Sequence, residues 1–170
     1  MGVTAEARTT AEGLPGRLPV TLISDGKLKP LTYEPPHASA QVKSAILLAG
    51  VNTHGTTSVI EPTLTRDHTE NMLRAFGVAV DSKLREGATH ISVTGPANLT
   101  ATTINVPGDP SSAAFPIVAA LITPGSDVVI ENVMMNPTRT GLFDCLTEMG
   151  GHVRPDNFRK SGGEIIADIH

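Results

Sequence analysis

Two segments of the sequence share the same order of residues, and this repeat limits the fold more than any other feature. Residues 49–77 read AGVNTHGTTSVIEPTLTRDHTENMLRAFG, and residues 119–150 read AALITPGSDVVIENVMMNPTRTGLFDCLTEMG. In both segments a glycine precedes an Ile-Glu pair, a Thr-Arg pair follows, and a second glycine closes the segment. The spacing is longer than that of the usual solenoid repeats, so it predicts a duplicated supersecondary unit.

The first copy predicts alternating strands and helices. A strand at 18–24 is followed by an apolar helix from Ser39 to Ala49, which Gly50 is placed to end. Next come a strand, an amphipathic helix closed by a glycine, and two strands separated by a polar turn. The expected ranges of these elements are 56–62, 66–76, 78–83 and 90–95. The order is therefore β-α-β-α-β-β.

The second copy predicts the same order. Its first helix starts at Asp109-Pro110, with Asp as the N-cap and Pro at the first helical position. Pro116 lies inside this helix and predicts either a kink or a delayed start. The other elements are expected to be a strand at 102–108, a strand at 127–133, a helix at 138–149 and strands at 151–157 and 164–170.

The start of the chain fits the end of an earlier copy. Residues 1–17 are expected to be the trailing strands of an incomplete unit, with a polar turn around Thr9 to Gly13. The helices at 38–49 and 113–122 are apolar on nearly every face, which is typical of helices buried on all sides. This chain alone cannot cover the apolar faces of both helices. We therefore expect a piece of a longer repeat protein that self-associates, is partly disordered or pairs with the missing parts.

Composition and charge exclude several classes of protein. The net charge of -4 argues against a nucleic-acid or anionic-membrane binder. No apolar run approaches the ~20 residues of a membrane span. The single cysteine, Cys145, excludes an internal disulfide and is expected to be packed and inert. The six histidines are scattered without the spacing of metal ligands. The expectation is a soluble cytoplasmic protein.

The apolar helix of the first copy begins with hydrogen-bonding residues. The stretch HASAQVKSAILLAG, residues 37–50, places Ser39, Gln41 and Lys43 in the first helical turn. One interpretation is that Ser39 caps the helix and Gln41 is ordinary polar surface. The other is that the helix start faces a ligand, since its free N–H groups and the positive end of the helix dipole favour an anion.

Two long stretches of the sequence resemble a known family. PPHASAQVKSAILLAGVNTHGTTSVIEPTLTRDHTENML and VPGDPSSAAFPIVAALITPGSDVVIENVMMNPTRTGL resemble the central region of EPSP synthase, the 3-phosphoshikimate 1-carboxyvinyltransferase of the shikimate pathway. The triad Ser39-Ala40-Gln41 is similar to the class II bacterial group, in which other members carry Ser-Ser-Gln. The Ser-Ala-Gln and TRDHTE stretches favour this family over the related enolpyruvyl transferases that act on UDP-N-acetylglucosamine.

The resemblance implies both a fold and a reaction. The fold is α/β, an inside-out α/β barrel of repeated β-α-β-α-β-β units in two domains joined by a hinge. With the hinge near Val106 to Asp109, residues 18–105 would be a complete unit of the first domain and residues 106–170 the first unit of the second. The family moves the enolpyruvyl group of phosphoenolpyruvate to shikimate 3-phosphate, releases phosphate and needs no metal or organic cofactor.

The resemblance also places substrates on particular residues. Ser39 and Ala40 match positions that lie against the phosphate of shikimate 3-phosphate, and Gln41 matches a position between that substrate and phosphoenolpyruvate. Ala40 has no hydroxyl, so only its backbone N–H can contribute. Arg66, at the expected start of the next helix, is well placed for a charge-assisted phosphate contact. Lys43 could make such a contact, but no position in the family's site is assigned to it.

Each of these residues also has a purely structural interpretation. The segment from Arg66 to His68 would ordinarily be a solvated helix start, with Asp67 and Glu70 in an arrangement like a capping box. Arg139 occupies the equivalent position in the second copy and is expected to be structural or to line a cleft. Asp109 and the serines after it are better explained as a hinge and cap than as an anion site.

Much of the family's chemistry is missing from this sequence. In the family, a Lys-Ser pair and a Gly-rich loop come from the N-terminal part, and the carboxylate base and several arginines come from the C-terminal part. This chain has neither, so we assign it no catalytic residue and predict no turnover by the chain alone. The alternative function is a non-catalytic folding, complementation or assembly fragment.

Overall fold

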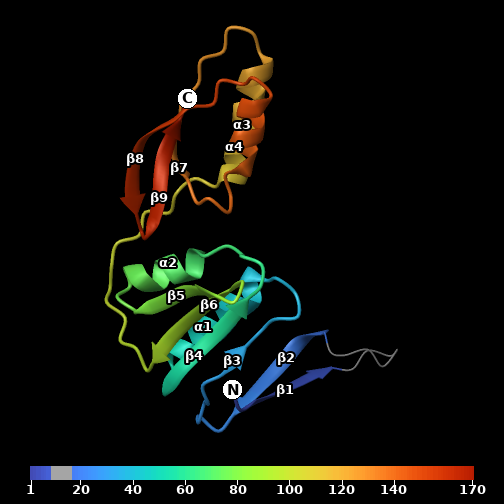
Figure 1. Ribbon diagram of the computed structural model, residues 1–170, viewed down its shortest axis with the longest axis vertical. Helices are drawn as coiled ribbons and strands as arrows, with labels where there is room; N and C mark the ends of the chain where they lie inside the picture. Colours follow the sequence, from blue (N-terminus) through green and yellow to red (C-terminus); the bar gives the residue numbers. More distant parts are fainter. Residues whose placement is uncertain (9–16) are drawn as a thin grey trace. The chain divides into compact units, whose positions relative to one another are not determined.

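The computed structural model describes residues 1–8 and 17–170, which form two compact units (Figure 1). The first unit comprises Met1–Leu64 and Ala79–Asn98, and the second comprises Thr65–Val78 and Leu99–His170. The polar turn expected around residues 9–13 lies outside the described residues. This division groups the helix expected at 66–76 with the last part of the chain. The assignment of 1–17, 18–105 and 106–170 to parts of two domains stays a prediction.

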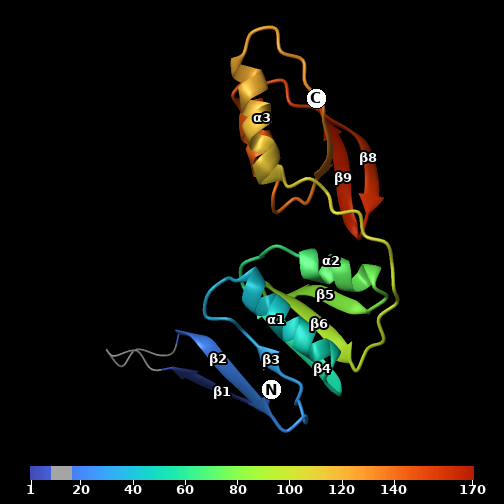
Figure 2. The same ribbon diagram turned by 180° about the vertical axis from the view of Figure 1, so that it is seen from behind.

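The first unit is built on a four-stranded sheet with the order β3-β4-β6-β5, and one helix, α1 (Ala40–Val51), packs on it (Figure 2). Strands β3 and β4 are parallel and the other neighbours are antiparallel. Leu47 of α1 and Val59 and Val93 of the sheet are buried. The strands are β3 (Thr32–Tyr33), β4 (Gly55–Glu61), β5 (Val80–Arg85) and β6 (Ala88–Gly95), and a separate antiparallel hairpin consists of β1 (Val3–Arg8) and β2 (Arg17–Ser24).

Helix α1 continues past the glycine that was expected to end it. Gly50 lies inside the last turn and is buried. A Cβ atom at this position would lie 2.7 Å from Cβ of Thr57 on β4 and 2.9 Å from Cγ2 of Val93 on β6. Gly50 therefore allows the helix to pack closely on the sheet. The prediction that it ends the helix is wrong.

The second unit is a three-stranded antiparallel sheet, of order β7-β9-β8, with α3 and α4 beside it (Figure 1). Its core joins Ala113 and Ile117 of α3, Phe143 of α4, Val133 of β7 and Ile169 of β9. The elements of this unit are α2 (His68–Ala75), α3 (Pro110–Ile122), β7 (Ile130–Met134), α4 (Gly141–Glu148), β8 (Pro155–Ser161) and β9 (Glu164–Ile169).

The strand expected at 102–108 does not form. Only Gly108 makes an isolated parallel bridge, to Val133 of β7. The register of β7 shifts between Ile130 and Val133, and Asn132 has a positive φ of 59°. The bulge disrupts the pairing of β7 with β9, and the segment before Gly108 lies outside the sheet.

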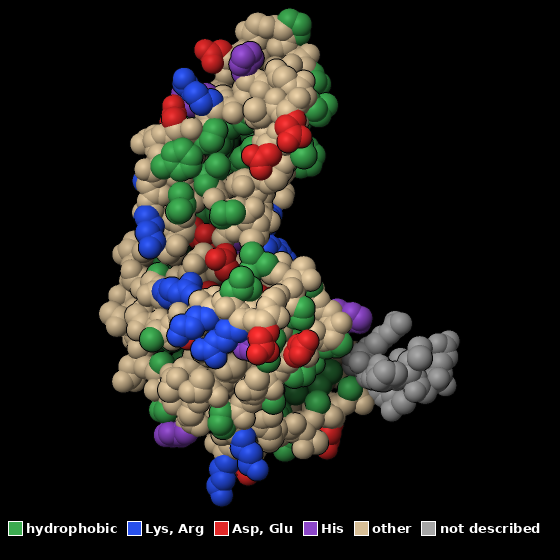
Figure 3. All heavy atoms as spheres, viewed as in Figure 1, with side chains coloured by type: hydrophobic (Ala, Val, Ile, Leu, Met, Phe, Trp, Pro, Cys, Tyr) green, Lys and Arg blue, Asp and Glu red, His purple; other side chains and the backbone are tan. Residues whose placement is uncertain are grey.

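Helix boundaries and exposure also differ from expectation. Helices α2 and α4 begin two and three residues later than the sequence suggested, whereas α3 starts at Pro110 and runs through Pro116, so its start is not delayed. Cys145 is exposed, and the expectation of a packed thiol is wrong. On α3, Phe115 is 80% exposed and Ile122 is 75% exposed. The surface therefore carries many hydrophobic side chains (Figure 3), in agreement with the expectation that this chain does not cover its apolar helices.

Candidate functional site

The start of α1 combines a serine cap with exposed polar groups. Ser39 is the N-cap in an extended conformation (φ -149°, ψ 108°), and its Oγ accepts a hydrogen bond from the Val42 amide at 3.3 Å. Ser39 and Ala40 are half-buried, and the side chain of Gln41 is exposed. The capping interpretation of Ser39 is therefore confirmed. The exposure of Gln41 leaves its carboxamide available to a ligand.

The electrostatics of this helix start favour an anion. The first turn contains no acidic residue. The amides of Ala40 and Gln41 have no acceptor among residues 1–8 and 17–170, as expected for the first N–H groups of a helix. Such N–H groups, at the positive end of the dipole, are suited to a phosphate or carboxylate.

Lys43 does not contribute its side chain to the exposed surface at this helix start. Its side chain is fully buried, and its Nζ lies 3.0 Å from Oε2 of Glu61, which is 4% exposed. A buried ammonium requires an opposing charge close by, and Glu61 at the end of β4 supplies one. Lys43 therefore joins α1 to β4 rather than presenting a cation to solvent.

Arg66 lies before α2 rather than inside its first turn. The helix begins at His68, and the Arg66 side chain is exposed. Its guanidinium has no carboxylate partner among the described residues. Ser39, Ala40 and Gln41 lie together at one helix start in the first compact unit, whereas Arg66 belongs to the second.

Asp67 does not form its half of the capping box expected at the start of α2. Asp67 is the N-cap residue, but its side chain makes no capping hydrogen bond and instead accepts one from Asn136 at 2.6 Å. Glu70, the other residue of the expected capping box, is buried. Asn136 and Glu164 are contacts of this helix start that the sequence did not reveal, because residues so distant in the chain carry no local pattern that links them.

The start of α3 is closed by the side chains of Asp109, Ser112 and Arg139. Asp109 accepts hydrogen bonds from the amide and the hydroxyl of Ser112, both at 3.2 Å, and Arg139 lies 2.7 Å from the other Asp109 oxygen. Desolvation would raise the pKa of Asp109, but the hydrogen bonds from Ser111 and Ser112 and the charge of Arg139 outweigh it, so that the pKa is lowered. The prediction of a cap is confirmed, and Arg139 is structural.

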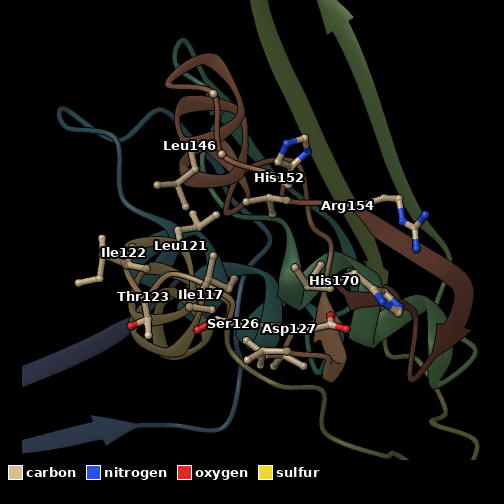
Figure 4. A pocket seen from close by; sticks show the side chains of 18 of the residues that line it. Ile117, Leu121, Ile122, Thr123, Ser126, Asp127, Leu146, His152, Arg154 and His170 are labelled. Atoms are coloured by element: carbon tan, nitrogen blue, oxygen red, sulfur yellow. The ribbon is translucent and has the colours of Figure 1, made fainter.

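Two pockets of the second unit lie away from the predicted site residues. One, of about 820 Å³, is lined by residues of α3, α4, the end of β9 and the loops beside them (Figure 4). Its apolar wall includes Ile117, Leu121 and Leu146, while Arg154 and His170 lie on the other side. None of the predicted site residues lines it. It is an apolar hollow beside the exposed side of α3.

A second pocket, of about 500 Å³, contains basic side chains from β8. One of them, Arg159, is held by Asp168 at 2.7 Å and by the side chain of Asn132. Hydrogen bonds from Arg159, Asn132 and Asn157 lower the pKa of Asp168 well below its ordinary value. The guanidinium of Arg159 is therefore already neutralised within the fold and is a weak candidate for binding an anion.

Two further classes of feature are missing from the part of the chain that the structure describes. No group of three or more His, Cys, Asp or Glu side chains there could hold a metal ion. No helix within residues 1–8 and 17–170 is long and apolar enough to cross a bilayer. The cytoplasmic location stays a prediction.

The two sheet-and-helix units and the open start of α1 define an α/β protein with a candidate anion-binding site. The model of the EPSP synthase (3-phosphoshikimate 1-carboxyvinyltransferase) family matches residues 1–165. The chain therefore belongs to the EPSP synthase family. This confirms the predicted resemblance and the α/β fold class, and it links the chain to transferases of the shikimate pathway.

Individual relatives agree with this assignment. A 3-phosphoshikimate 1-carboxyvinyltransferase from Gluconobacter oxydans is 60% identical over 162 residues, which are 95% of this chain and 36% of the relative. One from Chelativorans is 59% identical over 154 residues, 90% of this chain and 34% of the relative. The solved EPSP synthase from Acinetobacter baumannii superposes with a TM-score of 0.86 at 50% identity, covering 100% of this chain and 36% of that one. The chain thus spans about a third of the length of these relatives.

Proposed function

We propose that this chain supplies the shikimate 3-phosphate-binding part of a 3-phosphoshikimate 1-carboxyvinyltransferase. The observation that supports this most is the open start of α1, where Ser39 caps the helix, Gln41 is exposed and the first turn has no acidic residue. Free amides at the positive end of a helix dipole favour a phosphate group without requiring a metal.

Each residue has a proposed role. The Ser39 hydroxyl and the Ala40 N–H donate to the phosphate of shikimate 3-phosphate, and the Gln41 carboxamide contacts both that substrate and phosphoenolpyruvate. The exposed Arg66 adds a charge-assisted contact to the phosphate. Together these groups hold the acceptor while its hydroxyl attacks the enolpyruvyl carbon and phosphate leaves.

The proposal assigns binding, but not turnover, to this chain. The transfer needs a general acid/base that moves protons. It also needs cationic side chains around the phosphate and carboxylate of phosphoenolpyruvate. We assign these to segments of the longer relatives that this chain does not match, since it covers 36% of the Gluconobacter protein. If the purified chain alone released phosphate from a mixture of shikimate 3-phosphate and phosphoenolpyruvate, this part of the proposal would be wrong.

The direct test is a calorimetric titration of the chain with shikimate 3-phosphate. We expect Gln41→Ala and Arg66→Ala each to weaken binding about tenfold, because each removes a hydrogen bond to a charged group. Arg154→Ala, which removes another exposed arginine of the second unit, is the matched control and should bind like the parent. Equal affinities for all four proteins would overturn the proposed site.

The second candidate is a non-catalytic folding, complementation or assembly fragment. It is favoured by the exposed apolar side chains of α3, Phe115 and Ile122 among them, which would bind further units or a second copy of the chain. Mixing this chain with the remaining segments of a full-length relative separates the two. Restored transferase activity supports the first function, whereas a stable but inactive complex supports the second.

A further inference from the structure

A network of polar side chains joins the start of α2 to two distant segments of the second unit. One segment is the loop between β7 and α4, and the other is the first residue of β9. We call this the α2 polar network; its members are Asp67, His68 and Asn71 of the α2 start, Asn136 and Thr138 of the loop, and Glu164 of β9.

Asn136 is at the centre of the network and is only 4% exposed. Its Nδ2 donates to Oδ1 of Asp67 at 2.6 Å and to Oε2 of Glu164 at 3.3 Å. Its Oδ1 accepts from the amide of Thr138 at 3.0 Å and from the hydroxyl of the same residue at 2.6 Å. Since both ends of the carboxamide are engaged, its orientation is fixed, with the NH₂ group toward the two carboxylates.

Glu164 holds α2 through its other oxygen. Oε1 lies 2.8 Å from Nδ1 of His68 and accepts from Nδ2 of Asn71 at 3.3 Å. Because a carboxylate only accepts hydrogen bonds, Nδ1 of His68 carries the proton in this pair. Nε2 of His68 is buried without a hydrogen-bond partner among the described residues. One carboxylate therefore binds two side chains on the first turn of the helix.

A close backbone approach reinforces the same junction. Gly163, in the turn between β8 and β9, has a φ of 90°, and a Cβ there would lie 2.5 Å from the carbonyl oxygen of Asn71. Only glycine allows the turn to come this near to α2. The junction thus rests on two independent features: the polar side chains of the network and the absence of a side chain at Gly163.

We infer that Asn136 and Glu164 are positioning residues that fix the start of α2 and, through it, the phosphate-binding Arg66. Arg66 directly precedes Asp67, whose side chain is held by Asn136 instead of capping the helix. The Arg66 side chain is exposed, so the backbone that carries it sets the point from which it extends. This inference rests on the proposed function, in which Arg66 contacts phosphate.

The first experiment measures the junction without any ligand. Hydrogen exchange of the 71–76 backbone amides, a segment that runs from the Asn71 amide bound to the Asp67 carbonyl to the Phe76 amide bound to the Met72 carbonyl, is compared in the parent, Asn136→Ala and Glu164→Gln. Glu148→Gln, on the exposed end of α4, is the matched control. We expect about tenfold faster exchange in this segment for the two network variants only. Unchanged exchange in 71–76, or an equal increase throughout the second unit, overturns the inference.

Gly163→Ala provides a second route to the same junction. It keeps every polar group of the network and pushes the β8–β9 turn away from Asn71. The same local increase in exchange is expected, while Gly125→Ala is the control because it also has a positive φ and its Cβ would meet nothing. Equal exchange of the 71–76 amides in these two variants would count against the junction.

The second experiment links the junction to binding through a double-mutant cycle. Asn136→Ala should weaken shikimate 3-phosphate binding about fivefold in the parent, but should have no further effect once Arg66 has been changed to Ala. An equal loss in both backgrounds overturns the positioning role and leaves the proposed site intact. If Arg66→Ala alone has no effect, the role of Arg66 in the proposed function fails, and the exchange experiment still decides whether the network fixes the helix start.

Discussion

The starts of α1 and α3 show two opposite ways to build a helix from similar apolar sequences. At α1, Ser39 caps the helix and the first turn carries no acidic residue. At α3, the carboxylate of Asp109 caps the helix and places a negative charge at the positive end of the dipole, while Arg139 pairs with its other oxygen. The first helix start carries no carboxylate, while the second already holds one together with its arginine partner.

The sides of the two helices show the reverse pattern. Helix α1 is held along its length, by the buried Lys43–Glu61 pair and by the close contact of Gly50 with β4 and β6. Helix α3 leaves large apolar side chains such as Phe115 exposed. The comparison teaches that a helix start can remain free for a ligand when packing elsewhere fixes the helix. The following predictions test this from the largest expected effect to the smallest.

Removing the carboxylate of Glu61 should have the largest effect on stability. Glu61→Gln takes away an opposing charge at 3.0 Å from the buried Lys43, so we expect the free energy of unfolding to fall by about 3 kcal/mol. Urea denaturation followed by circular dichroism measures this. Glu148→Gln on the exposed end of α4 is the control. A parent-like midpoint for Glu61→Gln would show that the pair does not hold α1.

Filling the space at Gly50 should come next. Gly50→Ala places a Cβ within 2.7 Å of Thr57 and 2.9 Å of Val93, and overpacking of this kind costs about 1–3 kcal/mol. Gly141→Ala, at the start of α4 with nothing near its Cβ, should instead be neutral or slightly stabilising. Thermal melts of the two variants compare them directly. Equal melting temperatures would contradict the packing explanation.

A carboxylate at the start of α1 should make it resemble the start of α3. Ser39→Asp keeps a good N-cap, so stability should change by less than about 0.5 kcal/mol. The new negative charge repels phosphate, and we expect shikimate 3-phosphate to bind about tenfold more weakly. Ser39→Asn, a neutral cap of the same shape, should bind more tightly than Ser39→Asp. If the two bind equally, charge at this helix start is not what selects the ligand.

Acid should affect α3 more than α1. The pKa of Asp109 is lower folded than unfolded, so its contribution is present at neutral pH and is lost as the pH falls through the folded value, below the ordinary 3.8. The stability difference between the parent and Asp109→Asn should therefore shrink on acidification from pH 6 toward about pH 3. The Ser39→Asn variant, which removes no carboxylate, should differ from the parent equally at both pH values. A gap that widened in acid for Asp109→Asn would contradict the prediction.

The parts of the fold that could be predicted from sequence were those with local signals. The Asp109-Pro110 pair predicted the start of α3. The polar turn at Glu86-Gly87, where both residues have positive φ, joins β5 and β6 as a hairpin. Ser39 as a cap was also local. The expectation of a strand at 102–108 was wrong, because strand formation depends on a distant partner and only Gly108 of this segment pairs, with Val133 of β7.

The sequence by itself determined the repeat, the family and the cap of α1, because periodicity, long motifs and capping chemistry are all properties of neighbouring residues. Only the tertiary structure decided that Gly50 packs instead of terminating α1, that Lys43 points inward to Glu61, and that Asn136 takes the side chain of Asp67. Each of these depends on which distant atoms come within a few ångströms, and hydrogen bonds, ion pairs and steric overlap act only at that range.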